Sequence, residues 1–261
     1  AELEVVRGSF AQKALLTGVI EAVDSAQIKV PRTRENRLQI QWLAADGSGS
    51  IDATEMALQR DGYAEAITSA EILDTITQGF DGQIAVTYVE WGGAGSQHVI
   101  VPWTIIDGPE SAEAFAAALR TEPRRATGWN SISNAIAFSQ ELIESNSIDG
   151  HRRVIDISAD SGNYGGVPLP LARQNALEAD ITINGLAILC RDPDCSGRPR
   201  RMDLEEYFAQ EVIGGPGSFV VTVDDQRSFQ DAVRQKLLLE IAGEEPTTRD
   251  TAGLRQEPSA R

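Results

Sequence analysis

The chain has 261 residues, of which 41% are hydrophobic and 24% are charged, and its formal net charge at pH 7 is −16. This composition excludes a disordered or collagen-like chain, and the acidic charge argues against a nucleic-acid partner because it repels phosphate backbones. Its two histidines, His98 and His151, lie far apart in the sequence, which disfavours zinc hydrolases and histidine-based nucleophilic catalysis. No apolar run reaches the length of a membrane span, so no transmembrane segment is predicted.

Strand and helix signals alternate along most of the chain. In chain order they predict a strand over Leu38–Ala45, helices over Ala53–Ser69 and Ala70–Gln78, strands over Gln83–Trp91 and Gln97–Ile106, helices over Ser111–Leu119 and Ser131–Ile143, a strand over Arg153–Ser158, a helix over Leu169–Glu178, a strand over Ile181–Leu189, a helix over Leu204–Val212, a strand over Ser218–Val223 and a helix over Phe229–Ile241.

This alternation predicts an α/β fold with a doubly wound, mostly parallel six-stranded sheet and helices on both faces. The glycine-rich GGAGS between the second and third strands indicates a hairpin, so one edge strand is expected to be antiparallel. The aromatic residues Trp42, Tyr88, Trp91 and Trp103 lie on these strands or at their ends and are expected in the core. We assign the domain to residues 38–243, an N-terminal extension of uncertain structure to residues 1–37, and a disordered tail to residues 244–261.

The most informative polar motif follows the first predicted strand. There the sequence reads DGSGS, which places one carboxylate and two hydroxyls, those of Asp46, Ser48 and Ser50, on a tight turn. Oxygen-only ligands suit a hard cation, magnesium above all. Alone, the motif has another interpretation, since Ser50 or Asp52 would be an ordinary cap for the helix that follows.

Two further loops strengthen the metal interpretation. Asp160 ends the predicted strand that begins near Arg153, and the loop RATGWNS brings Thr127 and Asn130 to the start of another helix. In a doubly wound fold these loops meet the DGSGS loop at the carboxyl edge of the sheet, where such folds bind ligands. The sequence therefore predicts a metal site formed by Asp46, Ser48, Ser50, Asn130 and Asp160, with Mg²⁺ as the first choice and Mn²⁺ or Ca²⁺ as alternatives.

The DxSxS motif, the loop before a helix and the strand that ends in Asp resemble the metal-ion-dependent adhesion site (MIDAS) of von Willebrand factor type A (VWA) domains. The wider match is to an exported bacterial branch of uncharacterised function (DUF1194-like) and covers roughly residues 38–243. Segments that carry it include LQRDGYAEAI, IAVTYVEWGG, RRVIDISADSGN, ITINGLAIL and VIGGPGSFVV.

The resemblance implies a protein-binding module in which an Asp or Glu of a partner protein completes the coordination of the metal. It implies no catalytic residue, so the chain is not expected to be an enzyme. The alternatives are a metal-dependent hydrolase and a structural module whose metal site is vestigial.

The chain departs from the family at two points. Asn130 stands where the family usually has Thr, and Thr127 is a possible substitute although it lies out of register. Gln39 and Gln41 are unusual residues for a central buried strand. The Thr-to-Asn change leaves open the vestigial alternative.

Competing motifs fit less well. Residues 44–55 match a calcium EF-hand loop at several positions but have Ala44 at its first position, and no second EF-hand is present. A P-loop is absent because no lysine follows a glycine, and Asp46 replaces the first glycine of a GxSxG motif around Ser48.

Cys190 and Cys195 are the only cysteines, in the short loop CRDPDCSGRP. A disulfide between them would indicate an oxidising compartment; the alternative is two reduced thiols in the cytosol. Together with the exported branch that the chain resembles, this spacing predicts a periplasmic or secreted protein whose signal peptide has been removed.

Overall fold

A computed structural model describes residues 38–189, 203–223 and 229–242. The predictions of an N-terminal extension, of a disordered tail and of a Cys190–Cys195 disulfide lie outside the described residues.

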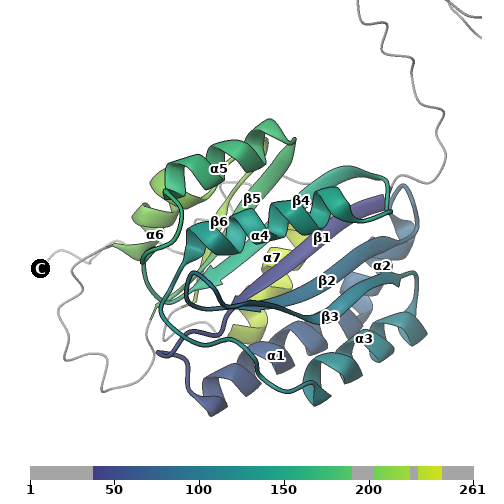
Figure 1. Cartoon of the computed structure of the whole chain (residues 1–261). Coiled ribbons are helices and arrows are strands. Elements are labelled where there is room, and N and C mark those ends of the chain that lie inside the picture. Colours follow the sequence, from purple (N-terminus) through teal and green to yellow (C-terminus); the bar gives the residue numbers. More distant parts are fainter. Residues whose placement is uncertain (1–37, 190–202, 224–228, 243–261) are drawn as a thin grey trace, which may run out of the picture. The chain divides into compact units, whose positions relative to one another are not determined.

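Six strands form one sheet in the order β3-β2-β1-β4-β5-β6 (Figure 1). Neighbouring strands are parallel, except that β3 runs antiparallel to β2 at one edge, as the hairpin signal predicts. The strands are β1 (Leu38–Asp46), β2 (Ile84–Trp91), β3 (Gln97–Ile106), β4 (Gly150–Ala159), β5 (Ile181–Ile188) and β6 (Val220–Val223).

Helices cover both faces of the sheet (Figure 1). One face carries α1 (Ala53–Thr68), α2 (Ala70–Gln78), α3 (Pro109–Thr121) and α7 (Phe229–Ala242). The other carries α4 (Ile132–Ser145), α5 (Leu169–Glu178) and α6 (Leu204–Tyr207), which continues into the π-helical turn η1 (Phe208–Val212). The predicted α/β fold with a doubly wound, mostly parallel sheet is therefore confirmed. Within the described residues, no helix is long and apolar enough to cross a membrane.

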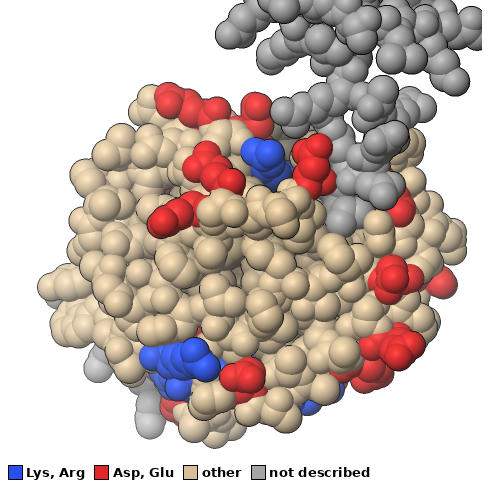
Figure 2. All heavy atoms as spheres, turned by 45° about the vertical axis from the view of Figure 1, so that its right-hand side comes forward, with Lys and Arg blue, Asp and Glu red and all other residues tan. Residues whose placement is uncertain are grey.

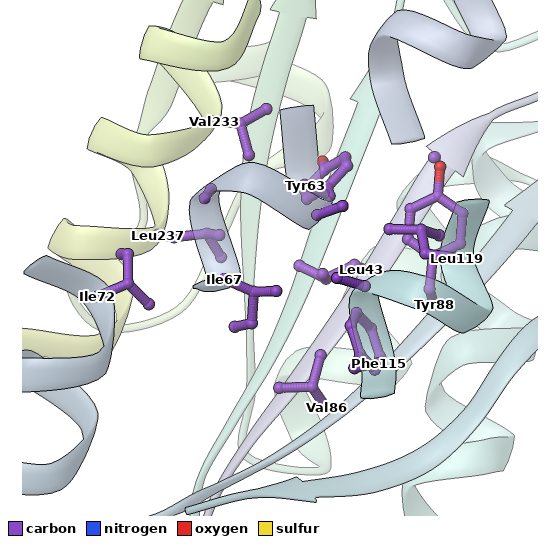
Figure 3. Close-up of a cluster of buried hydrophobic side chains, with 14 of the residues drawn as sticks. Leu43, Tyr63, Ile67, Ile72, Val86, Tyr88, Phe115, Leu119, Val233 and Leu237 are labelled. Atoms are coloured by element: carbon purple, nitrogen blue, oxygen red, sulfur yellow. The ribbon is translucent and has the colours of Figure 1, made fainter. Parts of the chain in front are cut away.

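Side chains alternate between two hydrophobic cores, because successive residues of a strand point to opposite faces. On β1, Leu43 packs with helices α1, α2, α3 and α7, whereas Trp42 packs on the side of α4 and α5. Figure 3 shows the first of these cores, where Tyr63 and Tyr88 lie close to Leu43. Trp42, Tyr88 and Trp91 are fully buried, as predicted, whereas Trp103 is half-buried against the second core.

The two glutamines of β1 belong to a buried polar network with α7. Gln41 Nε2 donates to Glu240 Oε2 over 2.5 Å, and Gln39 Nε2 donates to the Glu240 carbonyl over 2.8 Å. Asn184 Nδ2 donates to Glu240 Oε1, and Lys236 pairs with both Glu240 and Asp156. Polar residues are tolerated in this central strand because the network supplies their hydrogen bonds.

Two basic side chains are buried and contribute little charge to the surface. Lys236 is 1% exposed, and Arg60, 7% exposed, forms a buried ion pair with Glu90 at 2.6 Å. On the face shown in Figure 2, acidic side chains lie around a broad uncharged area, and basic side chains gather in few places. The described surface on this side is therefore acidic or uncharged over most of its area.

The strand order places β1 between β2 and β4. The chain winds from β1 toward β2 and β3 and then returns to β4 on the other side of β1. This reversal makes the carboxyl ends of β1 and β4 the switch point of the sheet, where doubly wound folds form their ligand crevice.

Candidate metal site

The loop that leaves β1 folds back on its own aspartate. Asp46 is the last residue of β1 and is fully buried, and its Oδ1 accepts a hydrogen bond of 2.8 Å from the backbone N–H of Ser48. The hydroxyl oxygens of Ser48 and Ser50 lie 3.0 Å apart. One carboxylate and two hydroxyls of the motif are thus brought together on one turn.

Backbone hydrogen bonds attach this loop to its neighbours. Gly47 N donates to the Trp91 carbonyl and Gly49 N donates to the Gly128 carbonyl, each over 2.8 Å. A Cβ on Gly47 would lie 2.7 Å from the Cβ of Ala126. Glycine is therefore needed here for the close approach of two loops.

Arg124 clamps the same loop from the side. Its Nη2 donates to the carbonyls of Gly47 and Ser48, and its Nη1 donates to the carbonyl of Ile51, each over 2.8 Å. The sequence alone did not indicate this role, since an arginine in a loop carries no signal for which distant carbonyls it will reach. The guanidinium fixes the turn that presents Ser48 and the residues around it.

Asp160 follows β4 and lies beside Asp46. Its backbone N–H points toward Asp46 Oδ2 at 3.4 Å. Burial and, to a smaller extent, the negative charge of Asp160 raise the pKa of Asp46 to about 7, against the opposing effect of hydrogen bonds from Ser48. A bound cation would offset both effects, because it stabilises the ionised carboxylates.

Asn130 supplies the most informative atom of the site. The residue is 5% exposed, and its Nδ2 donates to Asp160 Oδ1 over 3.0 Å and to the hydroxyl of Ser161. Its carbonyl oxygen, Oδ1, is buried and accepts no hydrogen bond from the described residues. A buried acceptor without a donor is unfavourable, and an oxygen-binding cation would satisfy it.

The structure therefore brings together all five predicted residues, Asp46, Ser48, Ser50, Asn130 and Asp160. It separates Thr127 from them. Thr127 is exposed, and its backbone is bonded to the β2–β3 hairpin through Ser96 Oγ and Gly93 N. Thr127 does not line the cavity at the site, so it does not substitute for Asn130.

Of the two candidates for the helix cap, Ser50 and Asp52, the structure uses Asp52. Asp52 caps α1, since its Oδ1 accepts from the N–H groups of Thr54 and Glu55, and Glu55 Oε2 accepts from Asp52 N over 2.9 Å. Because Asp52 and Glu55 form this capping box, neither Ser48 nor Ser50 caps α1. The EF-hand alternative does not hold, because a strand precedes the loop and Asp52 and Glu55 bond to each other.

A cavity of about 620 Å³ opens beside these side chains. Ser48, Ser50 and Asn130 contribute to its lining, and so do two exposed aromatic residues, Trp129 and Tyr164. The sequence did not single out this aromatic pair, because exposure is not visible in a local pattern. Neutral oxygen donors of the site thus line an accessible pocket, and the carboxylates of Asp46 and Asp160 lie behind them, bonded to Ser48 and Asn130. This donor set fits a hard divalent cation.

The sequence matches the family described as "Protein of unknown function (DUF1194)" over residues 37–245. The chain belongs to this family. A search of the curated proteins found no match to this DUF1194 chain.

Solved structures similar to this DUF1194 protein contain VWA-type folds. They include the pilus adhesin SpaC from Lactobacillus rhamnosus GG (13% identity, 80% of this chain and 31% of that chain, TM-score 0.53). Proximal thread matrix protein 1 from the mussel byssus, with a zinc-occupied MIDAS motif, has 14% identity over 80% of this chain and 49% of that chain, with a TM-score of 0.55. A von Willebrand factor type A protein from Catenulispora acidiphila has 16% identity over 79% of this chain and 42% of that chain, with a TM-score of 0.53.

The DUF1194 chain spans less than half the length of each of these three structures. At such low identity the likeness shows the fold alone. The protein therefore has a VWA-like α/β fold, as the resemblance in its sequence implies.

Proposed function

We propose that this protein is a metal-dependent protein-binding module. Asp46, Ser48, Ser50, Asn130 and Asp160 hold a divalent cation, Mg²⁺ in first place, directly or through water. The observation that carries the proposal is the buried Asn130 Oδ1, which has no donor among the described residues and belongs to an amide that is bonded to the Asp160 carboxylate. Oxygen ligands of this kind suit Mg²⁺, and they also accommodate Mn²⁺ or Ca²⁺.

When bound, the cation supplies a coordination position that a carboxylate from a partner protein can fill. The cavity beside the site provides room for that group. Support for a binding role comes from the fold, which the chain shares with a pilus adhesin and with a byssal matrix protein whose MIDAS holds zinc. The same neighbours, together with the Cys190–Cys195 spacing, support a periplasmic or secreted location.

We also propose that the protein is not an enzyme. A metal-dependent hydrolase needs a general base near its activated water. Among the described residues that line the cavity there is no Asp, Glu, His, Cys or Lys to act as such a base, and Asp46 and Asp160 are assigned to the cation. Turnover of phosphoester substrates by the wild type, lost in Asp160→Ala, would overturn this part of the proposal.

One observation favours a second candidate, a structural module with a vestigial site. Asn130 Nδ2 already donates to Asp160 Oδ1, so the amide stabilises this carboxylate without a cation. In that case metal would add no stability and no binding.

Isothermal titration of the full chain with Mn²⁺ and Mg²⁺ separates the two candidates. We expect one equivalent of metal to bind the wild type, and Asp160→Asn to weaken binding at least about tenfold, since a charged ligand is lost. Asp52→Asn is the matched control, because it removes a nearby charge while Asn still caps α1. No binding by the wild type at millimolar metal would favour the vestigial module.

A further inference from the structure

Two aromatic side chains stand beside the candidate metal site and face solvent. Trp129 is 67% exposed and Tyr164 is 61% exposed, and their ring centroids lie 4.7 Å apart with an angle of 38° between the ring planes. Both line the cavity that also contains Ser48, Ser50 and Asn130. Large exposed aromatic side chains grouped at a cavity are typical of interaction sites.

The loop that carries Tyr164 is fixed by hydrogen bonds on both sides. Tyr164 N donates to the carbonyl of Asn130, and Asn163 N donates to the hydroxyl of Tyr207 over 3.0 Å. The side chain of Asn163 in turn accepts from Ser133 N over 2.9 Å. Tyr164 is therefore held in place before any partner arrives, which lowers the entropy lost on binding.

Trp129 sits between two anchored residues. Gly128 before it accepts a hydrogen bond from Gly49 of the DGSGS loop, and Asn130 after it bonds to Asp160 and to Tyr164 N. The aromatic pair is consequently attached to the same backbone segments that present the candidate ligands. A partner bound to the cation would contact these rings.

The chemistry of the cavity lining restricts the partner. Glycines, serines, asparagines and the two aromatic residues line the cavity, and no charged side chain does so among the described residues. The carboxylates of Asp46 and Asp160 are assigned to the cation, so none of the described residues that line the cavity offers an anionic group to a basic side chain. An apolar side chain buries hydrophobic surface against the rings, whereas Lys or Arg would lose hydration there without gaining an ion pair.

We propose that Trp129 and Tyr164 form an aromatic platform for a partner-protein segment that carries an apolar residue directly beside its metal-binding Asp or Glu. This inference rests on the proposed function and names the partner of that same site. Tryptophan and tyrosine at the centre of an interface often contribute much of the binding energy. The platform therefore selects the partner, whereas the cation binds its carboxylate.

The test uses a displayed library of random peptides with one fixed central Asp, selected on the full chain in Mg²⁺ and eluted with EDTA. We expect the eluted peptides to be enriched in aromatic, aliphatic or proline residues next to the Asp. Trp129→Ala and Tyr164→Ala should weaken these peptides at least about tenfold, and Trp129→Phe should weaken them less. Leu171→Ala is the matched control, because Leu171 is exposed but does not line the cavity.

Mn²⁺ affinity, measured on the same variants, distinguishes a failure of the aromatic platform from a failure of the metal site. Unchanged Mn²⁺ affinity with weakened peptide binding supports the platform. EDTA-eluted peptides that lack any preference beside the Asp, or that bind Trp129→Ala as well as wild type, overturn the platform and leave the metal-dependent function intact. Absence of both Mn²⁺ binding and EDTA-eluted peptides overturns the proposed function and the platform with it. If neutral oligosaccharides bind in a Trp129-dependent way and this binding persists in EDTA, the platform recognises a glycan and the proposed protein partner is wrong.

Discussion

Asn130 Nδ2 donates a hydrogen bond of 3.0 Å to Asp160 Oδ1, while Asn130 Oδ1 has no donor among the described residues. The Asn130 amide therefore stabilises the Asp160 carboxylate, one candidate metal ligand, in the absence of metal. Its carbonyl oxygen remains available to a cation. This relationship decides how the site responds to substitution and to metal.

Asn130→Thr is expected to keep or strengthen metal binding. The change restores the residue usual for the resembled family, and it removes the Nδ2 donor to Asp160, so the metal-free protein should lose about 1 kcal/mol of stability. Mn²⁺ titration and urea denaturation in EDTA measure the two effects. Weaker metal binding together with unchanged stability would contradict this role of the amide.

Saturating Mg²⁺ or Mn²⁺ is expected to raise the melting temperature of the wild type. A ligand at one hundred times its Kd stabilises the folded state by about 2.7 kcal/mol, which corresponds to roughly 5–10 °C for a domain of this size. Differential scanning calorimetry with metal and with EDTA checks this, and Asp46→Asn should abolish the shift. An identical shift in Asp46→Asn would place the metal elsewhere.

Arg124→Lys is expected to weaken Mn²⁺ binding about tenfold. Lysine presents one ammonium group in place of the planar guanidinium that reaches the carbonyls of Gly47, Ser48 and Ile51. Arg125→Lys is the control, because the Arg125 side chain is half exposed and forms only a surface ion pair with Glu122, at 3.7 Å. Equal Mn²⁺ affinities of the two variants would show that the clamp does not position the site.

The buried network under α7 predicts a pH dependence of stability. Burial, opposed by the charge of Lys236 and supported by that of Glu240, raises the pKa of Asp156 to about 7. The folded state thus keeps a proton that the unfolded chain releases near pH 4, so this group lowers the stability as the pH rises from about 4 to about 7.

Asp156→Asn removes this dependence and leaves Lys236 paired with Glu240. The free energy of unfolding of the variant, relative to wild type, should increase by at least about 1 kcal/mol between pH 5 and pH 8. Urea denaturation at both pH values measures it, with the exposed Asp61→Asn as the control. A constant difference between variant and wild type would refute the assignment.

Replacing either of two adjacent glycines in the loop after Asp160 by alanine is expected to destabilise the protein, but by different amounts. Both have positive φ, +70° at Gly165 and +81° at Gly166, but a Cβ at Gly165 would meet no atom within 4 Å. A Cβ at Gly166 would lie 2.2 Å from Asn134 Oδ1 and 2.3 Å from Ser131 Oγ. We expect Gly165→Ala to cost about 1 kcal/mol and Gly166→Ala about 2–4 kcal/mol, and equal costs would argue against this packing.

Local sequence patterns predicted the helices and strands with bounds close to those observed. Hydrophobic periodicity and turn residues are short-range signals, so the strand over Leu38–Ala45 and the hairpin at GGAGS could be assigned without a structure. The pattern did not predict that the helix over Leu204–Val212 ends in a π-helical turn. Nor did it explain Gln39 and Gln41, because their acceptor on Glu240 lies about 200 residues away in the sequence.

The sequence by itself determined the α/β class, the strand that ends at Asp46 and the oxygen donors available at the carboxyl edge of the sheet. The tertiary structure alone decided that Thr127 lies apart from the site and that Arg124 bonds to the loop. It also decided that Asn130 Oδ1 has no donor within the described part of the chain, and that Trp129 and Tyr164 face solvent. The reason is physical: periodicity and capping act between residues a few positions apart, whereas burial and hydrogen-bond satisfaction depend on how distant segments pack together.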